Sequence, residues 1–323
     1  MKKNLNSFLI LLTTIFLTIE VIINSEEVID SARFSFTIWK DNIFPTLFPF
    51  FVSSALLIRY GFVEIIGELL KPLMYKLFKI KGETAFVLIL SMLSGFPSSS
   101  KYTKELYDNG IINEKEASKL LTFTHFPNPL FVIGTVAVLF LNNKMVGFLI
   151  LISIYLGNLI IGLIFRNYHP SINVDNKISI KKASDKIKAR YKKNSDFGTV
   201  LTNILLDSVN LLLLILGTIS LFLIVNKLIT NLFNLNDINR SLFSGLLEMT
   251  GGLKYVSLLD IDLNIKAIFA TMILSFGGLS VHTQIYSIIA DTKIKYIPFL
   301  IARLMHVVIS GSIIFVLLQI FKI

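Results

Sequence analysis

Residues 84–107 read TAFVLILSMLSGFPSSSKYTKELY: an apolar run, a Gly-Phe-Pro break and a polar, serine-rich run. Neither run reaches the ~20 apolar residues that a membrane-crossing helix needs. Glycine permits a sharp turn, and Pro97 ends one helix and can open the next. The stretch therefore predicts a re-entrant hairpin of two half-helices, which enters the membrane and returns.

Two later stretches are interrupted in a similar way. Residues 265–290 are apolar up to Phe276, break at Gly277 and Gly278, and continue from Ser280. They predict a second re-entrant hairpin that is likewise too interrupted to cross. Residues 241–259 are irregular, with a break predicted at Thr250-Gly251-Gly252.

The whole composition is that of a membrane protein. Of 323 residues, 54% are hydrophobic and 16% are charged, and the mean hydropathy is +0.71; soluble domains carry about 25% charged residues. The chain has no cysteine, which excludes disulfides, thiolate catalysis and cysteine-bearing metal sites. Stretches that are long and apolar enough to cross are 8–23, 43–60, 146–165, 200–225 and 295–321.

One more candidate span, residues 115–142, carries Pro127-Asn128-Pro129 in its middle. Proline removes a backbone donor and clashes with the preceding turn, so we expect two pieces, 115–126 and 130–142. Unwound backbone survives at membrane depth only where protein or a watery cavity surrounds it. The break is therefore a sign of function.

The charges predict the topology. Residues 166–193 hold nine lysines and arginines against two aspartates, a net charge of +7 out of +10 for the chain. Such loops stay in the cytoplasm, so we expect a cytoplasmic linker; contact with lipid headgroups is the alternative. Lys2 and Lys3 place the N-terminus on the same side, and residues 8–23 are expected to be an uncleaved membrane helix rather than a signal peptide. The amphipathic stretch 62–81 then lies on this inner face too.

Two similar halves flank the linker. Each has a long span, 43–60 or 200–225, followed by a broken half-helix, at Ser94-Gly95-Phe96-Pro97 or at Gly277-Gly278-Leu279-Ser280. The first span starts outside and the second inside, so the repeats are expected to be inverted. Paired, interrupted segments of this kind point to a transporter binding site near the bilayer midplane.

We therefore expect an all-α polytopic membrane protein with inverted repeats and two re-entrant hairpins. Its expected parts are an N-terminal membrane helix (1–31), a first repeat (32–166), the linker (167–197) and a second repeat (198–323).

The first break has the chemistry of an anion site. Glycine lets the backbone approach a ligand closely, and proline and serine are residues that begin and cap a helix. The free N–H groups and the dipole at such a helix start favour an anion. Lys101 and Lys104 add positive charge; alternatively, they only pair with Glu105 and Asp108 at i,i+4 spacing. The candidate ligand residues here are Gly95, Pro97, Ser98, Ser99, Ser100 and Lys101.

The other breaks supply further candidate groups. Ser280 is the expected cap of a half-helix, His282 and Gln284 offer hydrogen bonds, and His282 could carry a proton; a structural role is the alternative for a lone histidine. Glu248 is an ionisable group beside a break, either functional or at the membrane interface. The remaining candidates are Asn128, Thr250, Gly251, Gly277 and Gly278.

Enzyme signatures are missing, since the sequence has no H-E-x-x-H, G-x-S-x-G or P-loop motif. The four histidines, His125, His169, His282 and His306, lack metal spacing. We expect no catalytic site, metal or cofactor. The pI near 9.5 reflects cytoplasmic loops rather than nucleic-acid binding.

Six of these motifs carry a family resemblance: SGFPS (94–98), KYTKEL (101–106), LLTFT (120–124), NPLF (128–131), EMTGG (248–252) and FGGLSVH (276–282). Together they resemble the sporulation integral membrane proteins called YlbJ, over about residues 35–320. That family looks like a member of the nucleoside-recognition Gate superfamily, related to concentrative nucleoside transporters. The resemblance implies a stage V sporulation role and transport of dipicolinate, a dicarboxylate anion, from the mother cell across the outer forespore membrane.

The chain departs from the transporter relatives at the second hairpin. Their Asn-Phe-Ser-Ser stretch is replaced by Gly277-Gly278-Leu279-Ser280, and Glu248 is the expected counterpart of their substrate glutamate. The departure weakens the case for a nucleoside substrate and for a sodium site.

The sequence thus predicts a membrane transporter for a small organic anion, with dipicolinate as the expected substrate. Ser98, Ser99 and Lys101 would bind one carboxylate. Ser280, His282 and Gln284 would bind the other end or the ring nitrogen. Glu248 would orient the substrate or carry a coupling ion, a proton or sodium. Loss of Lys101 is then expected to abolish dipicolinate accumulation in spores.

Two other functions stay open at this point: a nucleoside or other small-solute transporter of the same fold, and a membrane scaffold that recruits sporulation proteins. The lipid bilayer is an expected partner, and a homo-oligomer is a further hypothesis.

Overall fold

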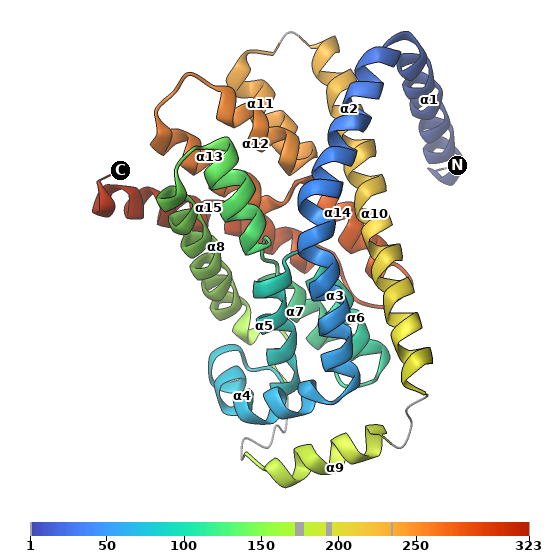
Figure 1. The fold of residues 1–323 in the computed structure, drawn as a ribbon, viewed down its shortest axis with the longest axis vertical. Coiled ribbons are helices and arrows are strands. Elements are labelled where there is room, and N and C mark those ends of the chain that lie inside the picture. Colours follow the sequence, from blue (N-terminus) through green and yellow to red (C-terminus); the bar gives the residue numbers. More distant parts are fainter. Residues whose placement is uncertain (1, 172–177, 192–195, 234, 323) are drawn as a thin grey trace.

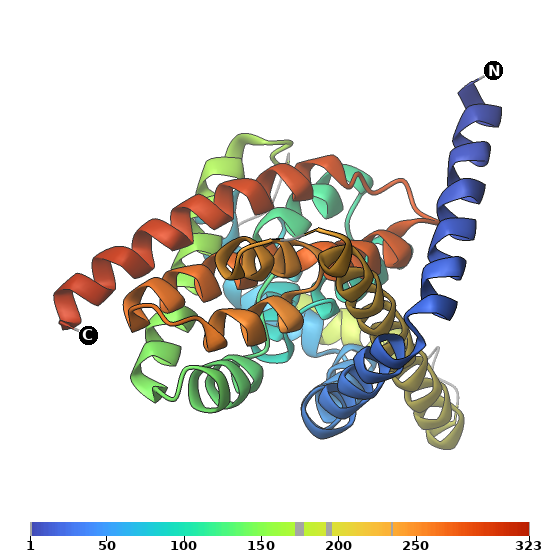
Figure 2. The same ribbon diagram turned by 90° about the horizontal axis from the view of Figure 1, so that it is seen from above.

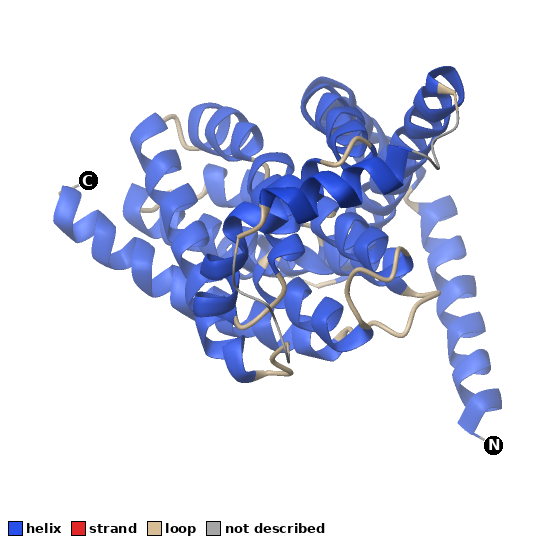
Figure 3. Ribbon diagram, turned by 90° about the horizontal axis from the view of Figure 1, so that it is seen from below, coloured by secondary structure: helices blue, strands red, loops and turns tan. Residues whose placement is uncertain are grey.

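The computed structural model describes residues 2–171, 178–191, 196–233 and 235–322, and all of these form helices and loops (Figure 3). The predicted all-α class is therefore confirmed. The expected basic linker is described only in part, because Asp175, Lys177, Lys192 and Lys193 lie outside the described residues.

The helices follow one another through both halves of the chain (Figure 1). The first half contains α1 (Lys2–Ile23), α2 (Ser25–Ile38), the π-helix η1 (Trp39–Ile43), α3 (Phe44–Arg59), α4 (Phe62–Phe78), η2 (Gly82–Thr84), α5 (Ala85–Ser94), α6 (Ser98–Asp108), α7 (Glu114–Phe123), the π-helix η3 (Phe131–Phe140), α8 (Lys144–Ile164) and η4 (Phe165–Asn167). The second contains α9 (Ile180–Tyr191), α10 (Phe197–Leu232), α11 (Asp237–Leu247), α12 (Met249–Leu258), α13 (Leu263–Phe276), α14 (Gly278–Ile289) and α15 (Ile297–Phe321).

Within the described ranges, five helical segments are long and apolar enough to cross a membrane: Ser25–Arg59, Lys144–Asn167, Phe197–Leu232, Leu263–Ile289 and Ile297–Phe321. The length and composition of these helices are those of a polytopic membrane protein. The span predicted at 43–60 is the second part of a helix that begins at Ser25, so the boundary expected at residue 31 falls inside α2. Helix α1, which contains the predicted span 8–23, contributes a shorter apolar helix, Thr14–Ile23.

Two details of the sequence prediction were wrong. Residues 265–290 are not too interrupted to cross, because α14 starts at Gly278, directly after the single residue Gly277 that ends α13. The break predicted at Thr250-Gly251-Gly252 lies instead at Glu248. Its carboxylate caps α12 by accepting the N–H of Gly251 at 2.8 Å, so the two glycines fall inside the helix.

Gly252 in α12 has a packing role. A Cβ atom on Gly252 would lie 2.2 Å from the Cα of Gly245 in α11. The two backbones are therefore in direct contact. This close approach explains Gly252, whereas Gly251 lies against Leu223 of α10, 2.8 Å from where its Cβ would be.

Two hydrophobic cores build the molecule. Residues of α2–α3, such as Leu47 and Phe51, form one with Leu212 and Ile219 of α10, and these helices run side by side as a two-helix layer (Figures 1 and 2). The hydroxyls of Ser35 and Ser220 lie 2.7 Å apart across it. The second and larger core joins α4–α8 with α12–α15.

Helices α4 and α9 cover one end of the larger core (Figure 1). The Glu68 carboxylate on α4 accepts the backbone N–H of Ser179, just before α9, at 2.7 Å. The amphipathic stretch and the described part of the linker therefore share one end of the molecule, as the topology prediction requires.

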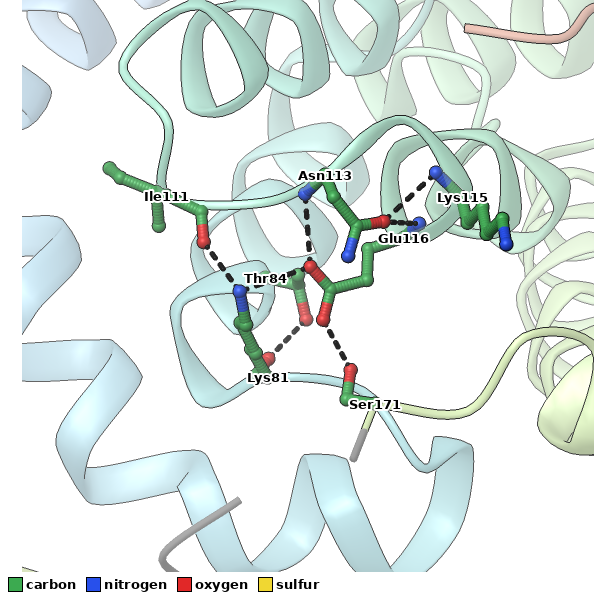
Figure 4. A network of polar contacts seen from close by, with 7 residues as sticks. All are labelled: Lys81, Thr84, Ile111, Asn113, Lys115, Glu116 and Ser171. Atoms are coloured by element: carbon green, nitrogen blue, oxygen red, sulfur yellow. Dashed lines mark hydrogen bonds and ion pairs between the residues drawn. The ribbon is translucent and has the colours of Figure 1, made fainter. Parts of the chain in front are cut away.

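A buried carboxylate organises this same end (Figure 4). Glu116 is 3% exposed; it pairs with Lys81 at 3.1 Å, accepts the hydroxyl of Ser171 at 2.5 Å and accepts the N–H of Asn113 at 3.0 Å. The last contact is half of a capping box that starts α7. One side chain thus joins the loop before η2, the start of α7 and the chain after α8.

Replacing Glu116 by alanine is expected to lower the apparent unfolding temperature in detergent by about 5 °C. The change leaves Lys81, the Ser171 hydroxyl and the Asn113 N–H without the acceptor that they share. Glu114→Ala, at the first position of the same helix, is the matched control and should shift it by about 1 °C or less. Equal shifts in the two variants would contradict the assigned role of Glu116.

Candidate functional site

The four interruptions of the membrane helices meet at one place. They are residues 95–97 between α5 and α6, residues 124–130 between α7 and η3, Glu248 between α11 and α12, and Gly277 between α13 and α14. A Cβ on Gly95 would lie 2.4 Å from the backbone N of Asn128, and one on Gly278 would lie 3.0 Å from the N of Met249. A Cβ on Gly277 would lie 3.0 Å from Nε2 of His125.

A small cavity of about 40 Å³ lies among these breaks. We call it the central cavity. The core side of its wall is formed by Phe96, Asn128, Phe131, Glu248, Met249, Val281 and Gln284, and the two-helix layer contributes Ile43, Thr46, Leu47, Ile215 and Ile219. Most of this wall is apolar, and a few polar groups are placed on it, which is typical of a small-molecule site.

Asn128 holds two of the breaks together. Its side-chain oxygen accepts the N–H groups of Leu130 and Phe131 at 2.8 and 3.1 Å, which caps the start of η3. Its amide nitrogen donates to the carbonyl of Ser94, the last residue of α5, at 3.2 Å. Backbone groups that lose their helical partners at these two ends are therefore satisfied by one side chain.

Glu248 has one engaged and one unengaged oxygen. Oε2 accepts the N–H of Gly251, whereas Oε1 has no hydrogen-bond partner among the described residues although Glu248 is fully buried. The neighbouring Thr250 is also fully buried, and its hydroxyl has no partner in the described part of the chain either. A buried carboxylate without a compensating cation is costly, so this oxygen is suited to hold a proton, a cation or a donor group of a ligand.

The start of α14 offers unengaged groups as well. Gly277, which precedes it, has φ +89° and no side chain that could cap the helix. The hydroxyl of Ser280 in the first turn is fully buried and has no partner. Gln284, one turn further, lies on the cavity wall and donates to the hydroxyl of Thr218 on α10 at 2.8 Å.

His282 is engaged within the protein. Its Nε2–H donates to the carbonyl of Phe276 at 3.0 Å, and the hydroxyl of Tyr296 donates to its Nδ1 at 2.5 Å. Both ring nitrogens of the neutral imidazole are therefore used. His125 is the contrasting case: it is buried against the ring of Phe96, and neither of its nitrogens has a partner.

The serine cluster of the first break lies mostly against its own backbone. Ser98 bonds to Ser94 and to the carbonyl of Gly95, and Ser100 donates to the carbonyl of Pro97 at 2.6 Å. The buried hydroxyl of Ser99 has no partner. Of the three serines, Ser99 is thus the one with hydrogen-bonding capacity left for a ligand.

Lys101 lies apart from the central cavity. Its ammonium is 5.5 Å from the centre of the Phe51 ring, on the wall of a second cavity of about 240 Å³. We call this the Lys101 cavity; its other polar lining residues are Arg59, Glu105, Asn203 and Asp207. Lys104 faces another way and binds Asp291 at 2.6 Å and Asp108 at 3.5 Å. Its ammonium holds the pKa of the Asp291 carboxyl below the ordinary value.

A third cavity, of about 330 Å³, lies on the opposite side of the central cavity along α10. We call it the Lys254 cavity. Its lining residues include Glu27, Phe34, Leu223, Asn226, Lys227, Gly251 and Lys254. Helix α10 lines all three cavities in turn. Asn203 and Asp207 line the Lys101 cavity, and Ile215 and Ile219 line the central cavity. Leu223 and Asn226 line the Lys254 cavity. Three cavities are therefore arranged in sequence between the two-helix layer and the larger core.

One residue at the site was missed by the sequence prediction. Arg303 of α15 is fully buried, and its guanidinium donates to the carbonyl of Thr122 at 2.6 Å and to Oδ1 of Asn158 at 2.9 Å. An arginine in the middle of the apolar stretch 295–321 is the signal that could have found it, since ionisable residues within spans are functional candidates by default.

The fold and its interior define a polytopic helical membrane protein in which broken helices enclose a small cavity. Residues 42–144 match the model of the Gate family, described as nucleoside recognition. The chain is 35% identical over 329 residues, covering 94% of this chain and 81% of the relative, to the sporulation integral membrane protein YlbJ of Bacillus subtilis (strain 168). No solved structure matches.

The chain therefore belongs to the family of YlbJ sporulation integral membrane proteins, and the resemblance predicted from its motifs is confirmed.

Proposed function

We propose that this protein is a sporulation membrane transporter that moves a small organic anion, with dipicolinate as the expected substrate, across the outer forespore membrane. The observation that carries the proposal is the convergence of four helix breaks on one cavity inside a polytopic membrane protein. Irregular backbone at membrane depth is tolerated where it lines a cavity, and in transporters it forms the substrate site. A scaffold would not require such a cavity.

The order of the breaks supports an internal repeat. In each half, a broken pair (α5–α6, then α11–α12) precedes a second broken element (α7–η3, then α13–α14), and a single long helix, α8 or α15, follows. In this arrangement residues 95–97 correspond to Glu248, and residues 124–130 to Gly277. The pairing differs from the one drawn from the sequence motifs alone.

An anion is favoured by the helix starts at the central cavity. Helix α12 is capped by Glu248 and η3 by Asn128, whereas α14 has no side-chain cap and presents the unengaged hydroxyl of Ser280. A carboxylate could accept from the N–H groups and the hydroxyl there. Ser99 offers a second donor at the first break.

An uncharged solute such as a nucleoside is the second candidate. Among the described residues that line the central cavity there is no lysine or arginine, and Asn128, Glu248 and Gln284 are side chains that bind ring nitrogens and hydroxyls.

Uptake by purified protein in liposomes tests the proposal. Labelled dipicolinate should accumulate in liposomes that contain the protein and not in empty ones, and unlabelled dipicolinate should compete with it. Accumulation of uridine without dipicolinate would support the second candidate. Uptake of neither solute, by protein that still binds sporulation partners, would support the scaffold.

Replacing Lys101 by methionine is expected to raise the KM for dipicolinate roughly tenfold and to change kcat little. The ammonium lies in a cavity next to the substrate cavity, where a fixed positive charge raises the local concentration of an anion. This expectation is milder than the full loss predicted from sequence. Lys104→Met, which removes a lysine paired at the surface, is the matched control; an equal change in both variants would contradict the role of Lys101.

A further inference from the structure

The guanidinium of Arg303 is surrounded by neutral groups. One nitrogen donates to the carbonyl of Thr122 and to Asn158, and the other donates to Nδ1 of His306 at 2.8 Å and to the carbonyl of Ser275 at 3.5 Å. A buried cation without a carboxylate needs such dipoles to compensate its lost hydration. The origin of these dipoles therefore indicates which parts of the chain Arg303 holds together.

Both carbonyls belong to helix ends. Thr122 is the penultimate residue of α7, and Ser275 is the penultimate residue of α13. A carbonyl in the last turn of a helix has no N–H partner in that helix, and the helix dipole gives this end a partial negative charge. A single cation thus satisfies the C-terminal ends of two half-helices at once.

The remaining partners fix the guanidinium in place. Since Nδ1 of His306 accepts from Arg303, its Nε2 carries the proton and donates to the carbonyl of Ile154 at 3.0 Å. The amide nitrogen of Asn158 donates to the carbonyl of His125 at 2.6 Å, on the unwound segment itself. The network therefore links α8 and α15 to the backbone of the second break.

We propose that Arg303 is a positioning residue, which holds the breaks after α7 and α13 in the arrangement that forms the central cavity. Asn128 follows the first of these ends by a few residues, and Ser280 follows the second. Arg303 lies behind the cavity wall and touches no ligand. That Arg303 positions the two breaks does not depend on transport. The effect of Arg303 on substrate binding rests on the proposed transport function.

Cysteine labelling tests the geometric part without any ligand. The natural chain has no cysteine, so single reporters can be placed at the two breaks, Thr124→Cys and Val281→Cys, and at a remote buried position on α4, Met74→Cys. All three positions are at most 3% exposed. Each reporter is combined with Arg303→Met, with Arg303→Lys, and with the control Arg33→Met, which removes an exposed arginine.

Arg303→Met is expected to speed labelling at both breaks by about tenfold or more and to leave Met74→Cys unchanged. Arg303→Lys should give a smaller rise at both breaks, because an ammonium cannot reach all four acceptors. If the methionine variant does not fold, the lysine variant decides alone. A rise at all three reporters, a rise at one break only, or no rise would each overturn the proposal.

Transport supplies the second readout. Arg303→Lys is expected to raise the KM for dipicolinate in liposomes severalfold with little change in kcat, because the binding geometry is altered and no reacting group is lost. Absence of uptake by the unmodified protein would refute the proposed function and leave the labelling result intact.

Discussion

Alanine at position 95 is expected to abolish uptake by a chain that still inserts into the membrane. Gly95 has φ +80° and ψ −176°, a backbone conformation that is essentially restricted to glycine and costs other residues about 1–3 kcal/mol. The added Cβ would also lie 2.4 Å from the N and 2.7 Å from the Cα of Asn128. Backbone atoms cannot rotate away as a side chain can, so the first two breaks must separate and Asn128 must release Ser94.

Substitutions at two other glycines distinguish the effect of backbone strain from the effect of the contact with Asn128. Gly110 has φ +67° with open space around it, so Gly110→Ala adds backbone strain alone; Gly134 has open space and no positive φ. We expect Gly110→Ala to lower the free energy of unfolding by about 1 kcal/mol with uptake retained, and Gly134→Ala to have little effect. Uptake into liposomes measures transport, and unfolding in detergent measures the free energy of unfolding of each variant. Normal uptake by the Gly95→Ala variant would show that contact between the two breaks is dispensable.

Glu248→Gln is expected to remove the response of uptake to an imposed proton or sodium gradient while the protein stays folded. Glutamine keeps an oxygen that accepts the Gly251 N–H, so the cap of α12 persists, but the unengaged Oε1 loses its charge and its ability to take up a proton. Liposome uptake with and without each gradient is the measurement.

Glu248→Ala provides the comparison, because it removes the cap as well. We expect it to cost about 1–2 kcal/mol of stability in addition to gradient-driven uptake. If Glu248→Gln still accumulates substrate against a gradient as the unmodified protein does, Glu248 does not carry the coupling ion.

Helix type and the positions of the breaks could be predicted from the sequence because they have local causes. Pro97 and Pro127 lie in two of the breaks, where proline removes a backbone donor, and Gly277 ends α13 in the left-handed conformation that glycine favours. Pro49 and Pro72, by contrast, lie inside α3 and α4. The location of the break at Glu248 could not be predicted so simply, because glycines at 251 and 252 suggested a turn. Gly252 serves instead the contact between α11 and α12, and Gly251 lies against Leu223 of α10, so both have a tertiary cause.

The composition of the site was only partly predictable for the same reason. Asn128, Glu248 and Gln284 line the central cavity as their places beside the breaks indicated, but Lys101 points into another cavity. Which way a side chain of α6 points depends on how that helix packs against α5, α7 and α14, and the local sequence does not encode this. His282 is engaged by Tyr296, a partner fourteen residues away in the chain.

The length of α10 has a consequence for depth in the bilayer. Thirty-six residues extend about 54 Å, whereas the hydrocarbon layer is only ~30 Å thick. Tilts of membrane helices rarely exceed about 40°, so α10, and with it the 35-residue segment Ser25–Arg59, must emerge into the headgroup region. The two-helix layer can therefore tolerate bilayers of different thickness. The half-helices of 10 to 14 residues in α5, α7 and α13 cannot cross alone, so we expect the breaks and the central cavity to lie near mid-membrane.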